Sequence, residues 1–266
     1  MKKITSFILA IFIAVSFCSC DKANGGSNHK DTVSFDKKST RVIAHRGLSG
    51  LELENTKEAF TAAGKRSYFG IEADVRKTSD GNFIICHDET LTRIANVDLK
   101  VEESTFEELI NTALKPQGND GQASHLCELE TYISICKTYS KHAVLELKSN
   151  FTETEISRII EIINSYGYLE SVTFISFNYT NLEYVRKILP GHSVQFLFST
   201  ISDEITARLI EDKIDAAISY KILTEDILTT FHNAGLTVNC WTVDDKNIAE
   251  NLSVLGVDYI TTNVLE

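Results

Sequence analysis

Short apolar runs alternate with longer amphipathic segments along most of this chain. The short runs are rich in Val, Ile and Phe and are bounded by polar residues, so they predict strands. The longer segments place apolar residues three or four positions apart, as surface helices do, and Ile156, Ile159 and Ile163 are the clearest example. The pattern therefore predicts strands and helices in regular alternation.

Eight β-then-α units within residues 41–266 predict an α/β fold, a (β/α)₈ TIM barrel formed by one domain. The predicted strands are Val42–Ala44, Gly70–Val75, Ala143–Leu147, Val172–Phe177, Val194–Phe198, Ala216–Ser219, Thr237–Trp241 and Tyr259–Thr261. The predicted helices are Thr56–Lys65, Glu153–Tyr166, Tyr179–Leu189, Asp203–Asp212, Glu225–Asn233 and Lys246–Leu255. We expect the last helix to be reduced or absent, because the sequence stops soon after Thr261. A doubly wound open sheet is the alternative, and the lack of a Gly-rich phosphate loop counts against it.

One stretch interrupts the alternation. Asn82–Cys86 reads as an extra strand, and residues 88–127 then pass before the next regular unit. Within them only Thr105–Asn111 has the pattern of a short helix, and residues 115–121 are polar. Long irregular segments inside a domain are usually lids or insertions. We therefore expect a small insertion after the second strand region, at about residues 88–127.

The N-terminal residues have the order of a secretory signal. Lys2 and Lys3 precede an apolar run over residues 7–17, which is too short to span a membrane, and small residues follow up to Cys20. The stretch ending at Cys20 resembles the lipobox of bacterial lipoproteins. Residues 1–20 therefore predict a lipoprotein-type signal peptide with Cys20 acylated, and plain cleavage and release is the alternative.

Residues 21–40 are polar and read as a tether between this anchor and the barrel. Together the two segments predict an exported protein, lipid-anchored in the cell envelope or periplasm of a bacterium. The lipid anchor is the only membrane contact that we expect.

Charge and cysteine content narrow the range of partners. The formal net charge is −11 and no basic run is present, so nucleic acid is not an expected partner. An anionic small molecule would need a local positive centre, such as a metal ion or a few buried cations. Four cysteines remain beyond Cys20, and we expect buried thiols, with disulfides left open: Cys86, Cys127, Cys136 and Cys240. The sequence does not indicate an oligomeric state.

Carboxylates occur on strands where a parallel barrel should be apolar. Glu72 and Asp74 alternate with apolar residues on one predicted strand, and Glu146 does so on another. Three buried carboxylates would repel one another unless a cation lies between them. Oxygen ligands favour Mg²⁺ or Ca²⁺ over zinc, so we expect one divalent cation. The alternative is a buried salt-bridge network that uses Arg46, Arg76 and Lys148.

Two histidines follow predicted strands at the end where barrel active sites form. His45 comes after the first strand and His87 after the extra strand. Imidazole titrates near pH 6.5 and can act as acid or base close to neutral pH. Two histidines beside a metal site suit a reaction that deprotonates one oxygen and protonates another.

Several short motifs in one order resemble the glycerophosphodiester phosphodiesterase family. They cover about residues 41–263 and include Val42-Ile43-Ala44-His45-Arg46-Gly47, Glu54-Asn55-Thr56, Gly70-Ile71-Glu72-Ala73-Asp74, His87-Asp88, Leu145-Glu146-Leu147-Lys148, Ile175-Ser176-Phe177, Trp241-Thr242-Val243 and Thr261-Thr262-Asn263. The family fold is a TIM barrel with a small insertion after the second strand region. The family usually has Pro before Glu-Asn-Thr, whereas Leu53 stands here.

The resemblance implies a metal-dependent hydrolysis of glycerophosphodiesters to glycerol 3-phosphate and an alcohol, through a cyclic phosphate. The implied metal ligands are Glu72, Asp74 and Glu146. The implied acid and base are His45 and His87. The implied phosphate-binding cations are Arg46 and Lys148, and Phe177 and Trp241 are candidates for an apolar wall that contacts glycerol carbons, although core packing would also explain them.

Two other functions stay open from the sequence. A phospholipase D-like barrel enzyme would act on intact phospholipids and would need an exposed apolar rim at the site. A non-catalytic surface lipoprotein that binds sugars or phosphates would normally have lost one of the histidines or acids, and none is missing here.

Overall fold

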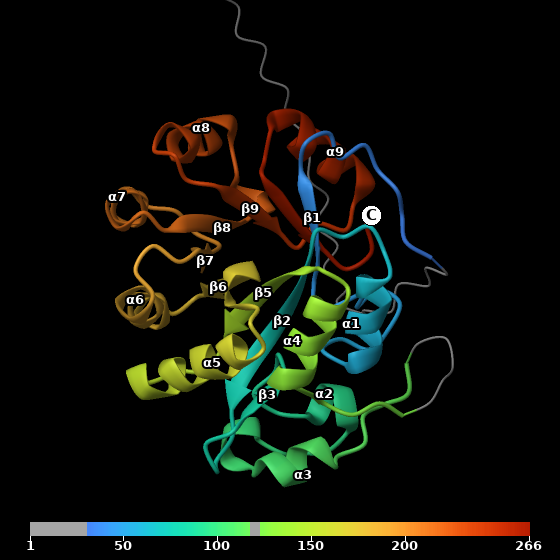
Figure 1. Ribbon diagram of the computed structural model, residues 1–266. Coiled ribbons are helices and arrows are strands. Elements are labelled where there is room, and N and C mark those ends of the chain that lie inside the picture. Colours follow the sequence, from blue (N-terminus) through green and yellow to red (C-terminus); the bar gives the residue numbers. More distant parts are fainter. Residues whose placement is uncertain (1–30, 118–122) are drawn as a thin grey trace, which may run out of the picture.

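The computed structural model describes residues 31–117 and 123–266, and it contains the predicted barrel (Figure 1). Eight parallel strands form a closed ring, because β1 pairs with both β10 and β2. These strands are β1 (Arg41–Ala44), β2 (Gly70–Lys77), β5 (His142–Leu147), β6 (Val172–Ser176), β7 (Val194–Phe198), β8 (Asp215–Ser219), β9 (Val238–Trp241) and β10 (Tyr259–Thr262). Every predicted strand is present, which confirms the TIM barrel and excludes the open sheet.

Seven helices between these strands surround the ring: α1 (Lys57–Gly64), α4 (Leu129–Thr138), α5 (Glu153–Ser165), α6 (Tyr179–Ile188), α7 (Asp203–Asp212), α8 (Glu225–Asn233) and α9 (Lys246–Leu255). The pattern predicts six of them and misses α4. Within the described residues no helix follows β10, as expected. Short 3₁₀ turns add η2 (Leu169–Ser171) and η3 (Tyr220–Ile222).

The insertion follows β2 and builds its own small core. β3 (Phe83–Ile85) runs antiparallel to β2, and β4 (Cys127–Glu128) runs antiparallel to β3. Between them lie α2 (Thr92–Ala95), η1 (Val101–Glu103) and α3 (Phe106–Ile110), at the lower edge of Figure 1. A separate apolar cluster holds them together: Leu53, Ile84, Cys86, Leu91, Ile94, Val101, Leu109, Leu114 and Leu126. This cluster fixes the chain that carries His87 to the side of the barrel.

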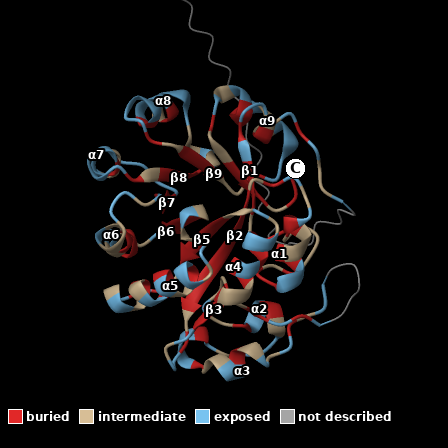
Figure 2. Ribbon diagram, in the orientation of Figure 1, coloured by how far each residue is buried: buried red, intermediate tan, exposed pale blue. Residues whose placement is uncertain are grey.

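Burial changes in layers along the barrel interior. The strands are buried, whereas the outer faces of the helices are exposed (Figure 2). Inward-facing apolar residues fill the middle of the ring: Ile43, Val144, Ile175, Leu197 and Ala217. The inward positions one step further toward the strand ends carry the acidic and basic residues singled out above. A packed apolar floor therefore lies under a polar site, which is the usual arrangement of this fold.

Residues 31–40, the described part of the expected tether, lie along the barrel. Val33 exchanges backbone hydrogen bonds with Val264 and Glu266, and Phe35 is buried. The expected signal peptide, its Cys20 and residues 21–30 lie outside the described residues, so those expectations stay predictions. Among the helices in the described ranges, none is long and apolar enough to cross a membrane.

The four cysteines of the barrel are buried free thiols. Burial raises the pKa of Cys86, Cys136 and Cys240 to about 12 each, so these thiols are neutral and pack as small apolar side chains.

One buried tyrosine links α4 to the two strands that carry the acids. The Tyr132 hydroxyl lies 2.7 Å from the Ile71 carbonyl oxygen and 3.3 Å from that of Val144. We expect Tyr132→Phe to lower the free energy of unfolding by about 1–3 kcal/mol, because buried carbonyls lose a donor. Urea denaturation measures this. Tyr184→Phe is the control, since its hydroxyl has no hydrogen bond in the described residues, and an equal loss there would contradict the explanation.

Candidate active site

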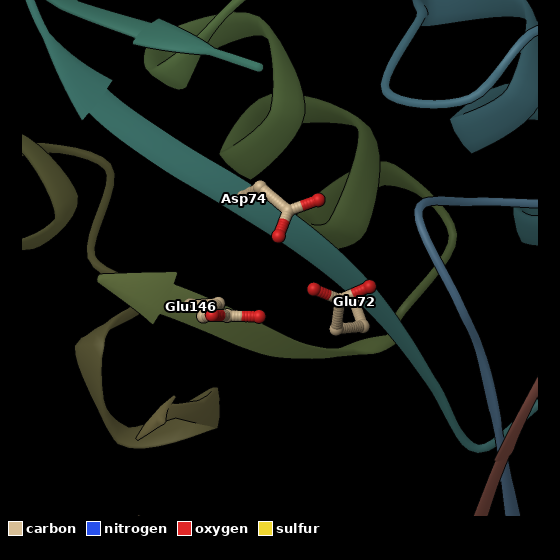
Figure 3. Close-up of side chains that lie close together, drawn as sticks. All are labelled: Glu72, Asp74 and Glu146. Atoms are coloured by element: carbon tan, nitrogen blue, oxygen red, sulfur yellow. The ribbon is translucent and has the colours of Figure 1, made fainter. Parts of the chain in front are cut away.

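Three carboxylates converge at the C-terminal ends of two neighbouring strands. Glu72 and Asp74 extend from β2, and Glu146 extends from β5 as the register partner of Asp74 (Figure 3). One oxygen from each side chain lies within 4.8 Å of the others, and all three residues are buried. We refer to these three residues as the acid cluster.

Burial and mutual repulsion disturb the ionisation of the acid cluster. Burial, with the charges of Asp74 and Glu146, raises the pKa of Glu72 well above its usual range. Burial and Asp74 raise the pKa of Glu146 to about 7. Burial acts in the same direction on Asp74, but Arg46, His87 and Lys148 outweigh it and lower the pKa of Asp74. The cluster therefore favours one full negative charge and resists three.

Nearby cations do not fully compensate these acids. Arg46 Nε lies 3.3 Å from an Asp74 oxygen, and Lys148 Nζ lies 2.9 Å from Glu146 Oε1. Arg76, the third cation of the predicted salt-bridge network, instead pairs with Glu102. Within the described ranges, Glu72 Oε1 and Asp74 Oδ1 are buried without a hydrogen-bond partner. Asp74 Oδ1 is still 3.7 Å from Lys148 Nζ, too far for a hydrogen bond. Buried oxygens without hydrogen bonds fit a hard divalent cation better than a completed ion-pair network.

The loop after β1 places Arg46 over the acid cluster. Arg46 and Gly47 both have positive φ, at 54° and 76°. A Cβ on Gly47 would lie 2.6 Å from the Ala59 carbonyl carbon, so only glycine fits this close approach to α1. The Arg46 backbone N–H donates to Glu72 Oε2 at 2.7 Å. The loop thus orients one acid with its backbone and a second with its guanidinium.

The motif after this loop supports the site from outside. Glu54 binds Arg46 at 2.9 Å and Arg93 at 2.6 Å, and it does not join the acid cluster. Asn55 donates to Asp74 Oδ2 at 2.7 Å, and the Thr56 side chain caps α1. Thr56 therefore begins the helix, whereas Asn55 orients one member of the acid cluster.

His45 is fixed by a chain of hydrogen bonds. Its Nδ1 lies 2.8 Å from Asn263 Oδ1, and Asn263 Nδ2 donates to Asp244 Oδ2 at 2.6 Å. Because the Asp244 carboxylate only accepts, Asn263 presents its amide oxygen to His45, and the proton lies on Nδ1. Nε2 is left with its lone pair, 4.0 Å from Glu72 Oε2. Burial, assisted by Arg46, lowers the pKa of His45 to about 4, so the ring is neutral at pH 7.

His87 is held by a carboxylate instead. Its Nδ1 lies 2.7 Å from Asp88 Oδ1, and the other Asp88 oxygen accepts from Arg93 at 2.7 Å. Arg76 donates two hydrogen bonds to the His87 carbonyl oxygen. Burial lowers the pKa of His87, whereas the charge of Asp74 and the hydrogen bond to Asp88 oppose that shift.

One cavity of about 170 Å³ brings these groups together. His45, Arg46, Glu72, His87, Glu146 and Lys148 line its polar side. The opposite side is apolar and includes Phe177, Trp241, Ile175 and Leu197. Asp74 lies beneath, fully buried. All nine residues singled out from the sequence therefore belong to one site.

The two aromatic residues differ in their surroundings. Phe177 is 50% exposed, and its ring meets that of Trp241 edge to face at 5.5 Å between centroids. The Trp241 ring is fixed because its Nε1 donates to the Ala217 carbonyl oxygen at 2.8 Å. The exposed Phe177 ring offers a surface that a substrate can contact, whereas Trp241 also packs against the apolar residues in the middle of the ring.

Sequence patterns did not indicate the residues that orient the histidines. Asn263 stands in a motif quoted for the family resemblance, but nothing in the pattern links it to His45. Asp244 follows β9 and meets Asn263 only because the strands are neighbours in the ring. The Asp88 contact could have been found, since Asp88 follows His87 directly.

Comparisons with known proteins agree with this site. The model of the Glycerophosphoryl diester phosphodiesterase family matches residues 45–266. A glycerophosphodiester phosphodiesterase of Caldanaerobacter subterraneus subsp. tengcongensis is 29% identical over 230 residues, which is 84% of this chain and 94% of the relative.

Two solved structures are also similar. An Oleispira antarctica phosphodiesterase in complex with the product sn-glycerol-3-phosphate superposes with a TM-score of 0.76 at 26% identity, covering 87% of this chain and 96% of the other. A glycerophosphodiester phosphodiesterase of Parabacteroides distasonis gives 0.70 at 25%, with 85% and 93% covered. Because the family match takes in nearly the whole barrel, this chain belongs to the glycerophosphoryl diester phosphodiesterase family, whose named members are hydrolases.

Proposed function

We propose that this chain hydrolyses glycerophosphodiesters to glycerol 3-phosphate and a free alcohol, with one divalent cation, Mg²⁺ or Ca²⁺, bound at the acid cluster. One observation carries the proposal. Two histidines line the same cavity as Glu72 and Glu146, and buried Asp74 completes the acid cluster. In the described residues neither Nε2 atom has a hydrogen bond, and two oxygens of the acid cluster have none either. The glycerol 3-phosphate in the Oleispira antarctica structure supports the choice of substrate class.

Glu72, Asp74 and Glu146 would hold the cation. When bound, it supplies positive charge that polarises a phosphoryl oxygen. Arg46 and Lys148 flank the acid cluster and contribute further positive charge, so that the phosphodiester meets cations from this chain on two sides. The apolar wall at Phe177 and Trp241 suits the glycerol carbons.

His45 is suited to act first as a base. Its ring is neutral, and Asn263 keeps the proton on Nδ1, so Nε2 can accept the proton of the glycerol 2-hydroxyl. That oxygen attacks phosphorus, and the bond between phosphorus and the leaving alcohol breaks. His87 gives its proton to the departing alcohol oxygen, and the Asp88 carboxylate stabilises the charged ring before this transfer.

The second step reverses these roles. His87 takes a proton from water, and the water oxygen attacks the cyclic phosphate. The bond between phosphorus and the 2-oxygen breaks, and His45 returns its proton to that oxygen. Both histidines then have the protonation state in which they began.

Loss of either imidazole tests the proposed roles. We expect His45→Ala and His87→Ala each to lower kcat about 10²- to 10⁴-fold, because each removes a proton-transfer group. The measurement is release of glycerol 3-phosphate from glycerophosphoethanolamine, with and without a chelator. Calorimetric binding of Mg²⁺ or Ca²⁺ should persist in both variants. Activity that survives chelation, or either substitution, would contradict the proposal.

The raised pKa of Glu146 predicts that the stability difference between wild type and Glu146→Gln depends on pH. Without metal, Glu146 binds a proton more tightly in the folded than in the unfolded protein, so it makes the free energy of unfolding fall between about pH 4.5 and 7. Glu146→Gln lacks this effect. We therefore expect its stability relative to wild type to rise across that window, by up to about 3 kcal/mol.

Urea denaturation in the presence of a chelator measures this difference, and the histidines common to both proteins cancel. Saturating Mg²⁺ or Ca²⁺ should reverse the order, because only the wild type retains all three carboxylates. A pH-independent difference would show that burial and Asp74 do not raise the pKa of Glu146.

The contact between Asn263 and His45 predicts that loss of Asn263 changes kcat without loss of substrate binding. Asn263→Ala removes the acceptor at His45 Nδ1, so we expect kcat to fall about 10- to 100-fold with little change of KM. Ring ¹⁵N shifts of His45 should show the proton no longer confined to Nδ1. Asp245→Ala is a control beside Asp244, since Asp245 caps α9 and does not touch this chain of contacts. Asp245→Ala should lower the free energy of unfolding and leave kcat unchanged.

A further inference from the structure

A second hollow lies beside the catalytic cavity, on the side of the insertion. It has a volume of about 550 Å³, and we refer to it as the insertion groove. His87 and Lys148 line both the groove and the cavity, so the two hollows meet at these residues. The remaining lining of the groove comes from Arg76 on β2 and from five polar residues of the insertion: Asp88, Glu89, Thr90, Thr92 and Arg93.

The sizes of the two hollows argue that the substrate uses both. A phosphodiester has two organic arms, and both must fit while phosphorus lies beside the acid cluster. The catalytic cavity, at about 170 Å³, is smaller than the roughly 300–1,000 Å³ common for pockets that enclose a whole ligand. The groove is the adjoining space, and His87 stands at the junction.

The position of His87 says which arm enters the groove. Its Nδ1 is bound to Asp88 and its carbonyl oxygen to Arg76, so Nε2 is the nitrogen left for proton transfer. His45 lies deeper, with 18% of its side chain exposed against 31% for His87. The alcohol that takes its proton from His87 is therefore the arm on the groove side.

The lining of the groove selects for charge. Every residue that lines it is polar or charged, although the stems of these side chains also contribute apolar surface. Its three basic side chains are already paired: Arg93 with Glu54 and Asp88, Arg76 with Glu102, and Lys148 with Glu146. Glu89 is exposed and has no ion-pair partner in residues 31–117 and 123–266. An alcohol with a positive charge matches this surface, and an anionic one does not.

We propose that the insertion groove binds the leaving alcohol and favours a cationic amino alcohol, such as ethanolamine, through the carboxylate of Glu89. The inference rests on the proposed function and adds to it the class of headgroup. The hydroxyl groups of Thr90 and Thr92 lie 3.2 Å apart in the groove and can form hydrogen bonds with polar atoms of the same alcohol.

Matched substrates and variants test this. The experiment compares kcat/KM for glycerophosphoethanolamine and for glycerophosphoglycerol, whose alcohol is neutral. We expect wild type to prefer the ethanolamine diester and Glu89→Gln to lose about 3- to 10-fold on that substrate alone. Glu89→Lys should lose more, and added salt should weaken the wild-type preference. Glu103→Gln is the control, because Glu103 is an exposed acid of the insertion paired with Lys100, away from the groove.

The outcomes separate the two proposals. If no soluble diester is hydrolysed, the proposed function fails. If both diesters are hydrolysed but Glu89→Gln changes them equally or not at all, only the groove assignment fails.

Discussion

The burial of three carboxylates side by side at the C-terminal end of the barrel is the constraint on which the rest of the site depends. Each buried charge without a partner costs several kcal/mol, and two cations cannot neutralise three acids. Arg46, Lys148 and Asn55 reduce the repulsion but leave two oxygens orphaned. The three carboxylates are therefore stable together only when they share protons or bind a cation. Keeping all three lowers the folding stability of the metal-free protein in return for a cation site.

The fold supplies rigidity around this strained centre. Apolar side chains fill the ring beneath the acid cluster, so the carboxylates cannot relax inward. The insertion carries His87 on a segment with its own core, and β3 attaches that core to the edge of β2. The elements that carry the acid cluster and His87 are therefore packed independently of a metal ion. The same packing fixes His87 relative to His45.

The alternation of short apolar runs with amphipathic segments was sufficient to predict the barrel, because parallel strands buried on both faces read as apolar runs. It missed α4, although Leu129, Tyr132 and Cys136 have helical spacing and are buried. The rule that barrel sites form at strand ends brought all nine predicted residues together. The contact of Asp244 with Asn263 could not be predicted, since it depends on the register of β9 with β10, and side-chain orientation across a ring has no signal in a single sequence.

The two histidines differ in a way that follows from their partners. An amide oxygen behind His45 fixes the tautomer without adding charge, whereas the Asp88 carboxylate behind His87 favours a charged ring. The proposed first step requires a neutral base and a cationic acid. The Asp88 contact favours the charged form of His87, against burial, which lowers the pKa of this ring. His87 lies where the catalytic cavity meets the insertion groove. The same residue that protonates the alcohol thus borders the surface on which that alcohol is recognised.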